Sequence, residues 1–100
     1  MKLQQSYRAF QQAGAEVVAL AVVPLAQVDG VRKVTGATFP LLADPVHRAA
    51  EAYGVYNLFN DALAAPSVFV VDTDGRIVWS YVGKNGGDRP DERVILEQLP

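Results

Sequence analysis

No cysteine occurs among the 100 residues of this chain. Without a thiol, the chain can form no disulfide, no thiolate metal site and no nucleophilic thiolate. The absence does not identify a compartment, because a reducing cytosol does not require a protein to lack cysteine. It therefore restricts the chemistry of the chain rather than its location.

An excess of positive charge is also missing, as are long apolar runs. Nine Lys and Arg stand against eleven Asp and Glu, and the formal net charge is -2. Such a chain has no basic field to hold a phosphate backbone, so we expect no nucleic-acid partner. No apolar run reaches the roughly 18 residues that cross a bilayer, and residues 1–5 lack the apolar segment of a signal peptide. We therefore expect no membrane partner and a cytoplasmic location.

The composition that remains is typical of one globular domain. Hydrophobic residues make up 50% of the chain and charged residues 20%, which excludes a disordered or low-complexity polypeptide. A chain of this length can bury a core without cross-links. We predict a single domain over residues 1–100.

Apolar residues recur at helical spacing in several segments. Leu3, Tyr7 and Phe10 share one helical face before Gly14, which is suited to end the helix. In a later segment, Asp44 is predicted as an N-cap and is followed by a first-turn proline. The predicted helices cover residues 3–13, 25–35, 45–53 and 90–99. The faces expected to be buried on the second and third comprise Leu25, Val28, Val31 and Val34, and Val46, Ala49, Ala50 and Tyr53.

Strands are predicted between these helices. Residues 16–23 form a short apolar run rich in β-branched side chains, which indicates a strand covered on both faces of a parallel sheet. Residues 67–71 and 76–82 flank the turn signal Thr-Asp-Gly and predict an antiparallel hairpin. A short strand is also predicted over residues 39–43. The alternation of helices and strands predicts an α/β fold with helices flanking a mixed sheet.

Three of these segments together resemble the peroxiredoxin family, the alkyl hydroperoxide reductase and thiol-specific antioxidant group of the thioredoxin-like superfamily. They are residues 39–45 (Phe-Pro-Leu-Leu-Ala-Asp-Pro), 52–55 (Ala-Tyr-Gly-Val) and 69–78 (Phe-Val-Val-Asp-Thr-Asp-Gly-Arg-Ile-Val). The resemblance runs from Leu3 to Leu99 and implies a thioredoxin-like mixed sheet. Pro66 stands where peroxiredoxins often carry an arginine. The run Pro-Ser-Val-Phe at residues 66–69 is more similar to the proline-led strand of thiol-disulfide oxidoreductases.

The resemblance also implies that part of the family fold is missing. In the family the reactive cysteine follows a central strand, at the start of the helix that corresponds to residues 3–13. That strand would lie between the strands at residues 16–23 and 67–71, so we expect an N-terminally truncated sheet. Each buried, unpaired backbone group would cost about 1–3 kcal/mol. We therefore expect a homodimer, a direct pairing of the two flanking strands, or an upstream segment that fills the gap.

The resemblance further places a candidate binding edge at Ala65 and Pro66, with Tyr56 and Phe59 beside it. It implies a cis bond before Pro66, whereas X-Pro bonds in general are cis in only about 5% of cases. A trans proline that opens an edge strand is the alternative. Tyr56, Phe59 and Leu63 could form an apolar groove beside Pro66, and packing of at least two of them in the core is the alternative.

Two other clusters give no firm site. Asp44, His47 and Glu51 fall near one helical face, but an N-cap and a solvated i, i+4 pair explain them better than a metal does. Residues 84–88 could form an anion-binding nest, although a surface loop is favoured. We predict no metal and no cofactor.

The family implies peroxidase or thiol-disulfide oxidoreductase activity, which this chain cannot perform unaided because no other side chain replaces the thiolate. We therefore predict a peroxiredoxin-like domain of antioxidant ancestry without its own catalytic residue. Two alternatives stay open: a non-catalytic module that binds a protein partner or supports assembly, and a partial chain of a longer, active oxidoreductase.

Overall fold

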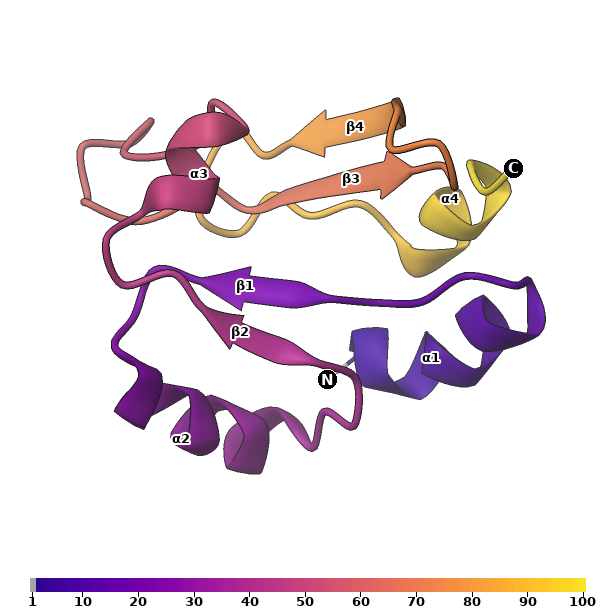
Figure 1. The fold of residues 1–100 in the computed structure, drawn as a ribbon, viewed down its shortest axis with the longest axis horizontal. Coiled ribbons are helices and arrows are strands. Elements are labelled where there is room, and N and C mark those ends of the chain that lie inside the picture. Colours follow the sequence, from indigo (N-terminus) through magenta and orange to yellow (C-terminus); the bar gives the residue numbers. More distant parts are fainter. Residues whose placement is uncertain (1) are drawn as a thin grey trace.

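A computed structural model describes residues 2–100 as four helices and four strands that alternate along most of the chain (Figure 1). In chain order they are α1 (Lys2–Gln12), β1 (Ala19–Ala21), α2 (Leu25–Thr35), β2 (Leu41–Ala43), α3 (Arg48–Ala52), β3 (Ser67–Val71), β4 (Ile77–Val82) and α4 (Glu92–Glu97).

The strands form two separate pairs instead of one sheet. β1 pairs in parallel with β2, and β3 pairs antiparallel with β4. The predicted α/β class, with parallel and antiparallel pairing and flanking helices, is confirmed. β1 and β3 are not paired with each other within the described residues, so direct pairing of the two flanking strands is not how this fold closes the gap.

Two small core clusters lie on opposite faces of these strand pairs. The first is centred on Phe10, Val70 and Ile95, which brings α1 and α4 against β3. The second is centred on Ala50, Val55 and Ala65, beside α3. Val17 packs on the first cluster, whereas Val22 packs on the second. Residues flanking β1 and residues of β3 thus contribute to both core clusters. The two strand pairs therefore share both clusters, although no sheet hydrogen bonds join β1 to β3.

The hairpin of β3 and β4 is confirmed, and local chemistry explains it. The Asp72 carboxylate accepts hydrogen bonds from the backbone N–H groups of Asp74 and Arg76, at 2.9 Å each. Gly75 takes a φ of 84°, which an L side chain rarely adopts. One irregularity of the register lies between Val70 and Val71. Sequence-local contacts therefore close the turn.

The N-terminal half of the chain packs around the side chain of Phe39, which is fully buried. α2 ends at Gly36 in the left-handed conformation, as predicted. The following turn is held by Arg32, whose guanidinium donates to the Ala37 carbonyl oxygen at 2.8 Å. The ring of Tyr7 meets that of Phe39 edge-on, with centroids 5.5 Å apart. This one aromatic side chain thus links α1 to the segment before β2.

The prediction of a strand covered on both faces at residues 16–23 was wrong. β1 comprises only Ala19–Ala21, and the side chains of Val18 and Leu20 are 49% and 52% exposed. The predicted stripe on α2 is also largely exposed, with no buried residue in the helix. A strand paired on one side only lacks an adjoining strand whose side chains would pack beside its own, and cavities lie next to Leu20 on both sides of β1.

The start of α3 differs from the prediction. Its N-cap is His47, with a left-handed φ of 51°, and Pro45 lies before the helix. The Asp44 carboxylate still acts as a capping acceptor, because it receives the backbone N–H groups of Ala49 and Ala50. Ala50 is buried as expected, whereas Val46 and Tyr53 of the predicted buried face are largely exposed. Likewise, α4 begins after Asp91, which accepts from the Arg93 N–H, and not at Pro90.

The bond before Pro66 is trans, so the cis bond implied by the resemblance is wrong for this structure. The trans form of an X-Pro bond is favoured by about 0.5–1 kcal/mol unless the surroundings impose the other isomer. Here Ala65 donates to the Val55 carbonyl at 2.9 Å, and the Pro66 carbonyl accepts from Gly83 at 2.7 Å. Both hydrogen bonds form with a trans peptide before Pro66.

Candidate functional site

The backbone of β1 pairs with β2 along one edge and leaves its other edge free. The Ala19 N–H donates to the Pro40 carbonyl, and the Ala21 carbonyl accepts from Asp44. Because backbone groups alternate between the two sides of a strand, those of Val18, Leu20 and Val22 point toward the opposite edge.

β3 presents a matching free edge. The Gly83 N–H donates to the Pro66 carbonyl, which fixes which residues of β3 bond to β4. In an antiparallel pair the hydrogen-bonded positions alternate, so Val68 and Val70 face β4. The backbone groups of Ser67, Phe69 and Val71 therefore point away from β4, toward β1.

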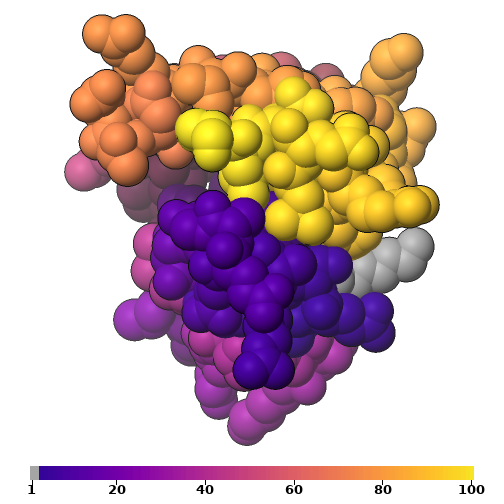
Figure 2. Space-filling view, turned by 90° about the vertical axis from the view of Figure 1, so that its right-hand side faces the viewer, coloured from indigo at the N-terminus to yellow at the C-terminus, as the bar shows by residue number. Residues whose placement is uncertain are grey.

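A cleft of about 1830 Å³ lies between these two edges. Residues of both strands line it, from 17–23 on one side and 65–73 on the other, and α3 and α4 add side chains. Figure 2 shows the C-terminal residues lying directly on the N-terminal ones, and α1 is in contact with α4. The two strand pairs are thus held together around the cleft by helices and not by sheet hydrogen bonds.

The wall of the cleft is apolar, and its charged residues are mainly acidic. Val18, Leu20, Leu63 and Val71 of the lining are between 46% and 52% exposed. The charged lining residues are Glu16, Asp44, Asp72, Arg89, Asp91 and Glu92. Glu16 precedes β1 and Asp72 follows β3, so these two carboxylates lie at the same end of the cleft, where β1 begins and β3 ends (Figure 1).

The four residues predicted for the binding edge divide into two groups. Ala65 and Pro66 line the cleft. Tyr56 and Phe59 do not line it and pack instead on the second core cluster, around Ala50, Val55 and Ala65. A binding role for the four together stays a prediction, and the predicted alternative of core packing describes where the two aromatic side chains lie.

His47 lies near this cluster but does not enter the cleft lining. Its ring stacks on Tyr56 with centroids 3.8 Å apart, and its Nδ1 lies 2.8 Å from the Glu51 Oε1 atom, as the i, i+4 pairing predicts. Hydrogen bonds from the Ala50 and Ala49 backbone outweigh burial and lower the pKa of Asp44. Residues 2–100 contain no cluster of three or more His, Asp and Glu arranged to hold a metal ion.

The loop at residues 84–88 holds an anion of its own. The Asp88 carboxylate accepts from the Lys84 backbone N–H at 2.8 Å and from the Tyr81 hydroxyl at 2.6 Å. These two bonds, the Tyr81 bond above all, lower the pKa of Asp88 against the opposing effect of burial. The same hydrogen bond raises the pKa of Tyr81. Because an internal carboxylate fills this nest, it is not open to an external anion.

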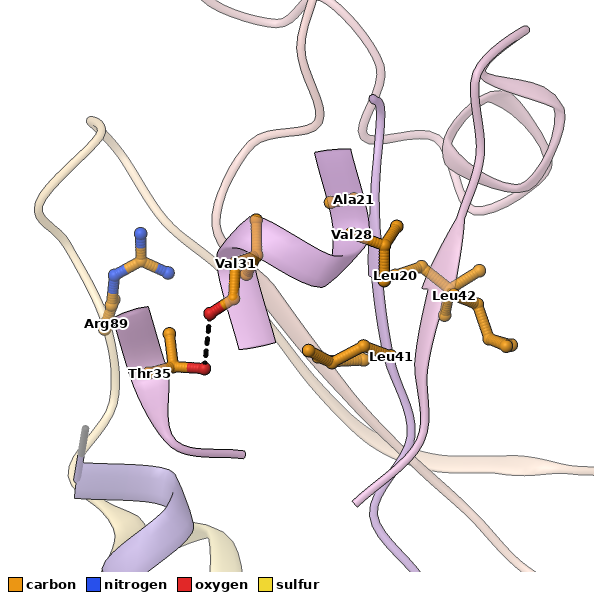
Figure 3. A pocket seen from close by; sticks show the side chains of 9 residues that line it. Leu20, Ala21, Val28, Val31, Thr35, Leu41, Leu42 and Arg89 are labelled. Carbon is orange, nitrogen blue, oxygen red and sulfur yellow. Dashed lines mark hydrogen bonds between the residues drawn. The ribbon is translucent and has the colours of Figure 1, made fainter. Parts of the chain in front are cut away.

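A second, smaller cavity of about 320 Å³ lies between α2 and the β1–β2 pair (Figure 3). Its lining is apolar apart from the Thr35 hydroxyl and the Arg89 guanidinium. The Thr35 hydroxyl donates to the Val31 carbonyl of the same helix at 2.8 Å and is therefore already satisfied. The cavity lies beside α2, which has no buried residue, and its lining presents no group suited to catalysis.

The arrangement around the main cleft can pair with backbone and bury apolar side chains. It cannot attack a peroxide or a disulfide, since the chain contains no thiol. Sequence reasoning did not single out Val18, Leu20 and Val71 as lining residues. The alternation within each strand would have identified them once the free edges were known.

The model of the AhpC/TSA family matches residues 1–80. The chain therefore belongs to this family of peroxiredoxin-like, thioredoxin-fold proteins, as the three sequence motifs predicted. A comparison with curated proteins gives no match.

Three of the solved structures with a similar fold are those of AhpC proteins. The structure of Enterococcus faecalis AhpC has a TM-score of 0.81 and 23% sequence identity, and the match covers 97% of this chain and 60% of that one. Mycobacterium bovis AhpC gives a TM-score of 0.81 at 20% identity, with 95% and 55% covered. Mycobacterium tuberculosis AhpC gives 0.80 at 20% identity, with 95% and 54% covered. This chain thus spans little more than half the length of these structures.

Proposed function

We propose that this chain is the cysteine-free scaffold of a peroxiredoxin-like domain, which carries out no thiol chemistry unaided and works together with polypeptide that it does not itself contain. The observation that carries the proposal is the pair of free strand edges facing each other across the cleft. An unpaired strand edge presents a row of free backbone donors and acceptors that can pair with another strand, so such edges favour completion by another segment.

The absence of unaided activity can be tested directly. The purified chain is assayed for peroxide reduction with a thiol reductant, beside a buffer blank and an authentic cysteine-containing peroxidase. We expect turnover equal to the blank, because no side chain here forms the low-pKa thiolate that the reaction requires. Turnover above the blank that survives repurification would overturn the proposal.

The ancestry of the domain supports a more specific role for the complete protein. If a segment with a cysteine completes this scaffold, the assembled domain is an antioxidant peroxidase or a thiol-disulfide oxidoreductase. The coding sequence upstream of residue 1 tests this version. An in-frame strand followed by a cysteine motif would support it, and an in-frame stop codon in that region would contradict it.

A binding or assembly module is the second candidate, favoured by the apolar exposure along the cleft. In this version the edge at Ala65 and Pro66 holds a protein partner, and Tyr56 and Phe59 support that edge from the second core cluster. Alanine substitution of Pro66 would then weaken partner binding while leaving the fold intact. Unchanged binding by a folded variant would exclude this edge.

When no completing segment is present, we propose that two copies associate through their free edges. Exposed, unpaired edges are the usual route by which strands pair between chains. Sedimentation over a range of concentrations tests this version: we expect dimers, and a dilute sample that stays monomeric would refute it.

Within residues 2–100, no helix has the length and apolar character to cross a membrane. A cytoplasmic location is part of the proposal.

A further inference from the structure

We infer that Asn85 is a site of spontaneous covalent modification, at which the side-chain amide is lost through a cyclic imide formed with the backbone nitrogen of Gly86. The site lies in the loop at residues 84–88, where the Asp88 carboxylate already fills the anion nest. The inference goes beyond the proposed function and does not rest on it.

The first condition for this reaction is met by the residue types. Ring closure requires an asparagine, whose side chain gives a five-membered ring, and a following residue that leaves its backbone nitrogen open to attack. Gly86 follows Asn85, and a Cβ atom built on Gly86 would meet nothing within 4 Å. Both residues are exposed, so water and base reach the peptide bond between them. Asn85 therefore combines a reactive amide with an uncrowded nitrogen.

The attacking nitrogen is also free of a hydrogen bond. Within residues 2–100 the Gly86 N–H donates to no acceptor, whereas the Gly87 N–H donates to the Asn85 Oδ1 atom and the Asp88 N–H to the Asn85 carbonyl oxygen. An N–H that already donates would have to give up its bond before its nitrogen could lose the proton. The Gly86 nitrogen meets no such barrier.

The side chain of Asn85 is both held and polarised. Its Oδ1 atom accepts from the Gly87 N–H at 2.9 Å, a bond that bridges the Gly86 backbone and is typical of asparagine in turns. A donor aimed at a carbonyl oxygen stabilises the negative charge that develops on that oxygen when the carbon is attacked. The Gly87 N–H is therefore placed to favour ring closure.

The reaction balances with water as its only reagent. The Gly86 nitrogen gives up its proton and bonds to the Asn85 Cγ atom, while the Cγ–Nδ2 bond breaks and Nδ2 leaves as ammonia with that proton. Water then adds to one of the two ring carbonyls and breaks the bond between that carbon and the nitrogen. Opening at Cγ gives an ordinary aspartate, and opening at the backbone carbonyl gives an iso-aspartyl link. Either product adds one negative charge.

Comparable positions elsewhere in the chain lack one of these conditions. Asn57 and Asn60 are each followed by a residue with a side chain, and both are held at a left-handed φ of 58°. Asp74 precedes a glycine, but a carboxylate is a poorer electrophile than an amide, and the Gly75 N–H donates to the Asp72 carbonyl oxygen at 3.0 Å. These positions therefore serve as internal controls.

The product disturbs the open end of the β3–β4 hairpin. The iso-aspartyl form lengthens the main chain of the loop and converts the Asn85 carbonyl, which accepts from the Asp88 N–H, into part of a free carboxylate. This loop packs closely on Gly83, where a Cβ atom would lie 2.5 Å from the Asp88 carbonyl oxygen. Gly83 in turn donates to the Pro66 carbonyl. Conversion of Asn85 should therefore loosen the hydrogen bond that holds the edge at Pro66.

The experiment follows the mass of one tryptic peptide while the purified chain is incubated at mildly alkaline pH and body temperature. Trypsin releases residues 85–93, because the bond before Pro90 resists cleavage, and Asn85 is the only asparagine in that peptide. Residues 49–76, released in the same digest, contain Asn57 and Asn60. A digest at time zero corrects for conversion during handling. We expect the peptide of residues 85–93 to gain the mass of one deamidation, while residues 49–76 stay unchanged.

Variants separate the causes of the reaction. G86A should slow conversion at least about two- to fivefold, because alanine has less of the conformational freedom that ring closure uses. G87A keeps the Gly87 N–H and brings its Cβ only to ordinary contact, 3.6 Å from the Asn85 Oδ1 atom, so it should convert at the parent rate. N85Q should lose the conversion, since its longer side chain would have to close a six-membered ring.

Hydrogen exchange measures the structural consequence. The converted protein, separated by ion exchange through its added charge, should exchange the Gly83 amide about two- to tenfold faster than the parent, as expected for one weakened backbone hydrogen bond. The Trp79 amide, in the middle of β4, should be unchanged. N85D adds the charge without lengthening the main chain, so it should show less of this increase.

Three outcomes would count against the inference. Protection of Asn85 in the folded chain, under conditions in which the urea-unfolded chain converts, would show that the fold prevents the reaction. Equal conversion of Asn57 or Asn60 would show that the loop confers nothing on Asn85. Unchanged exchange of the Gly83 amide would remove the link to Pro66. The peroxidase blank and the upstream coding sequence bear on none of these results, so this inference and the proposed function fail independently.

Discussion

The two strand pairs of this protein are stabilised in different ways. The β3–β4 hairpin is closed by its own turn, where Asp72 accepts the Asp74 and Arg76 N–H groups, and it is flanked by a core that includes Val70. The β1–β2 pair has three residues in each strand, is joined through α2, and leaves Leu20 half exposed. A hairpin carries its partner beside it in sequence, whereas a parallel pair depends on a crossover and on neighbours.

This difference indicates which of the two strand pairs is more affected by the lack of a central strand between β1 and β3. Neither pair has a strand on its free edge. The strand at residues 16–23 was predicted to be covered on both faces, but Val18 and Leu20 are about half exposed. We expect the hairpin to keep its local stability without a strand in the cleft and the β1–β2 pair to be the first to open. Four pairs of substitutions test this contrast, in order of decreasing effect.

The largest effect is expected for Phe39→Ala. Phe39 is fully buried and carries the contact between Tyr7 and the segment before β2, so its loss should lower the free energy of unfolding by about 3–5 kcal/mol. Urea denaturation measures this loss, and hydrogen exchange should show faster exchange in β1 and β2 than in β3 and β4. Val34→Ala, at a site 87% exposed, is the control and should change stability by less than about 0.5 kcal/mol. Equal losses in the two variants would contradict the role given to Phe39.

Gly83→Ala tests the open end of the hairpin, where Gly83 follows β4 and bonds to Pro66 before β3. A Cβ atom at Gly83 would lie 2.5 Å from the Asp88 carbonyl oxygen and 3.0 Å from that of Pro66, and both are backbone atoms. We expect a loss of about 1–3 kcal/mol, concentrated in β3 and β4 when read by hydrogen exchange. Gly86→Ala, where a Cβ meets nothing within 4 Å, should show no such loss. An unchanged melting temperature for Gly83→Ala would refute the close approach.

The pH dependence of stability should change in Asp88→Asn. Hydrogen bonds from Tyr81 and Lys84 lower the pKa of Asp88 in the folded state, so its contribution is fully present above its ordinary pKa, near 4. That contribution is lost as the pH falls through the lowered folded value. The difference in melting temperature between the parent and Asp88→Asn should therefore shrink as the pH falls from 7 toward 3. Tyr81→Phe should show the same trend, and a difference that grows with acidity would contradict it.

The smallest effect is a gain in stability. Gly30 lies inside α2, and a Cβ atom added there would meet nothing within 4 Å, so Gly30→Ala should stabilise the chain by about 0.5–1 kcal/mol through helix propensity alone. Gly36→Ala is the matched opposite, because its φ of 68° disfavours an L side chain, and it should destabilise by about 1 kcal/mol. Thermal unfolding compares the two, and signs other than these would contradict the assignment of the helix and its end.

Features with local causes were predictable from the sequence. The hairpin follows from turn residues between two β-branched runs, and Gly75 takes the positive φ that its turn requires. α1 and α2 follow from apolar spacing and from the glycines that come after them. The family follows from three motifs whose mutual spacing is preserved along the chain.

Features with distant causes were not predictable. Tyr56 and Phe59 pack on the second core cluster and do not line the cleft, which depends on where α3 and β3 come to lie. The bond before Pro66 is trans, and the residues on either side of it are hydrogen-bonded to Val55 and Gly83, which are distant in the sequence. His47 took the N-cap position expected for Asp44, although the Asp44 carboxylate kept the capping bonds.

The sequence by itself determined that no thiol chemistry belongs to this chain, because that depends only on residue types. It also determined most helix and strand positions, since periodicity, caps and turns act over a few residues. The resemblance implied a gap between these two strands, but only the tertiary structure decided that β1 and β3 do not pair across it and that a cleft lies between them. Strand pairing joins residues far apart in the chain, so the free edges appear only when the elements are placed in space.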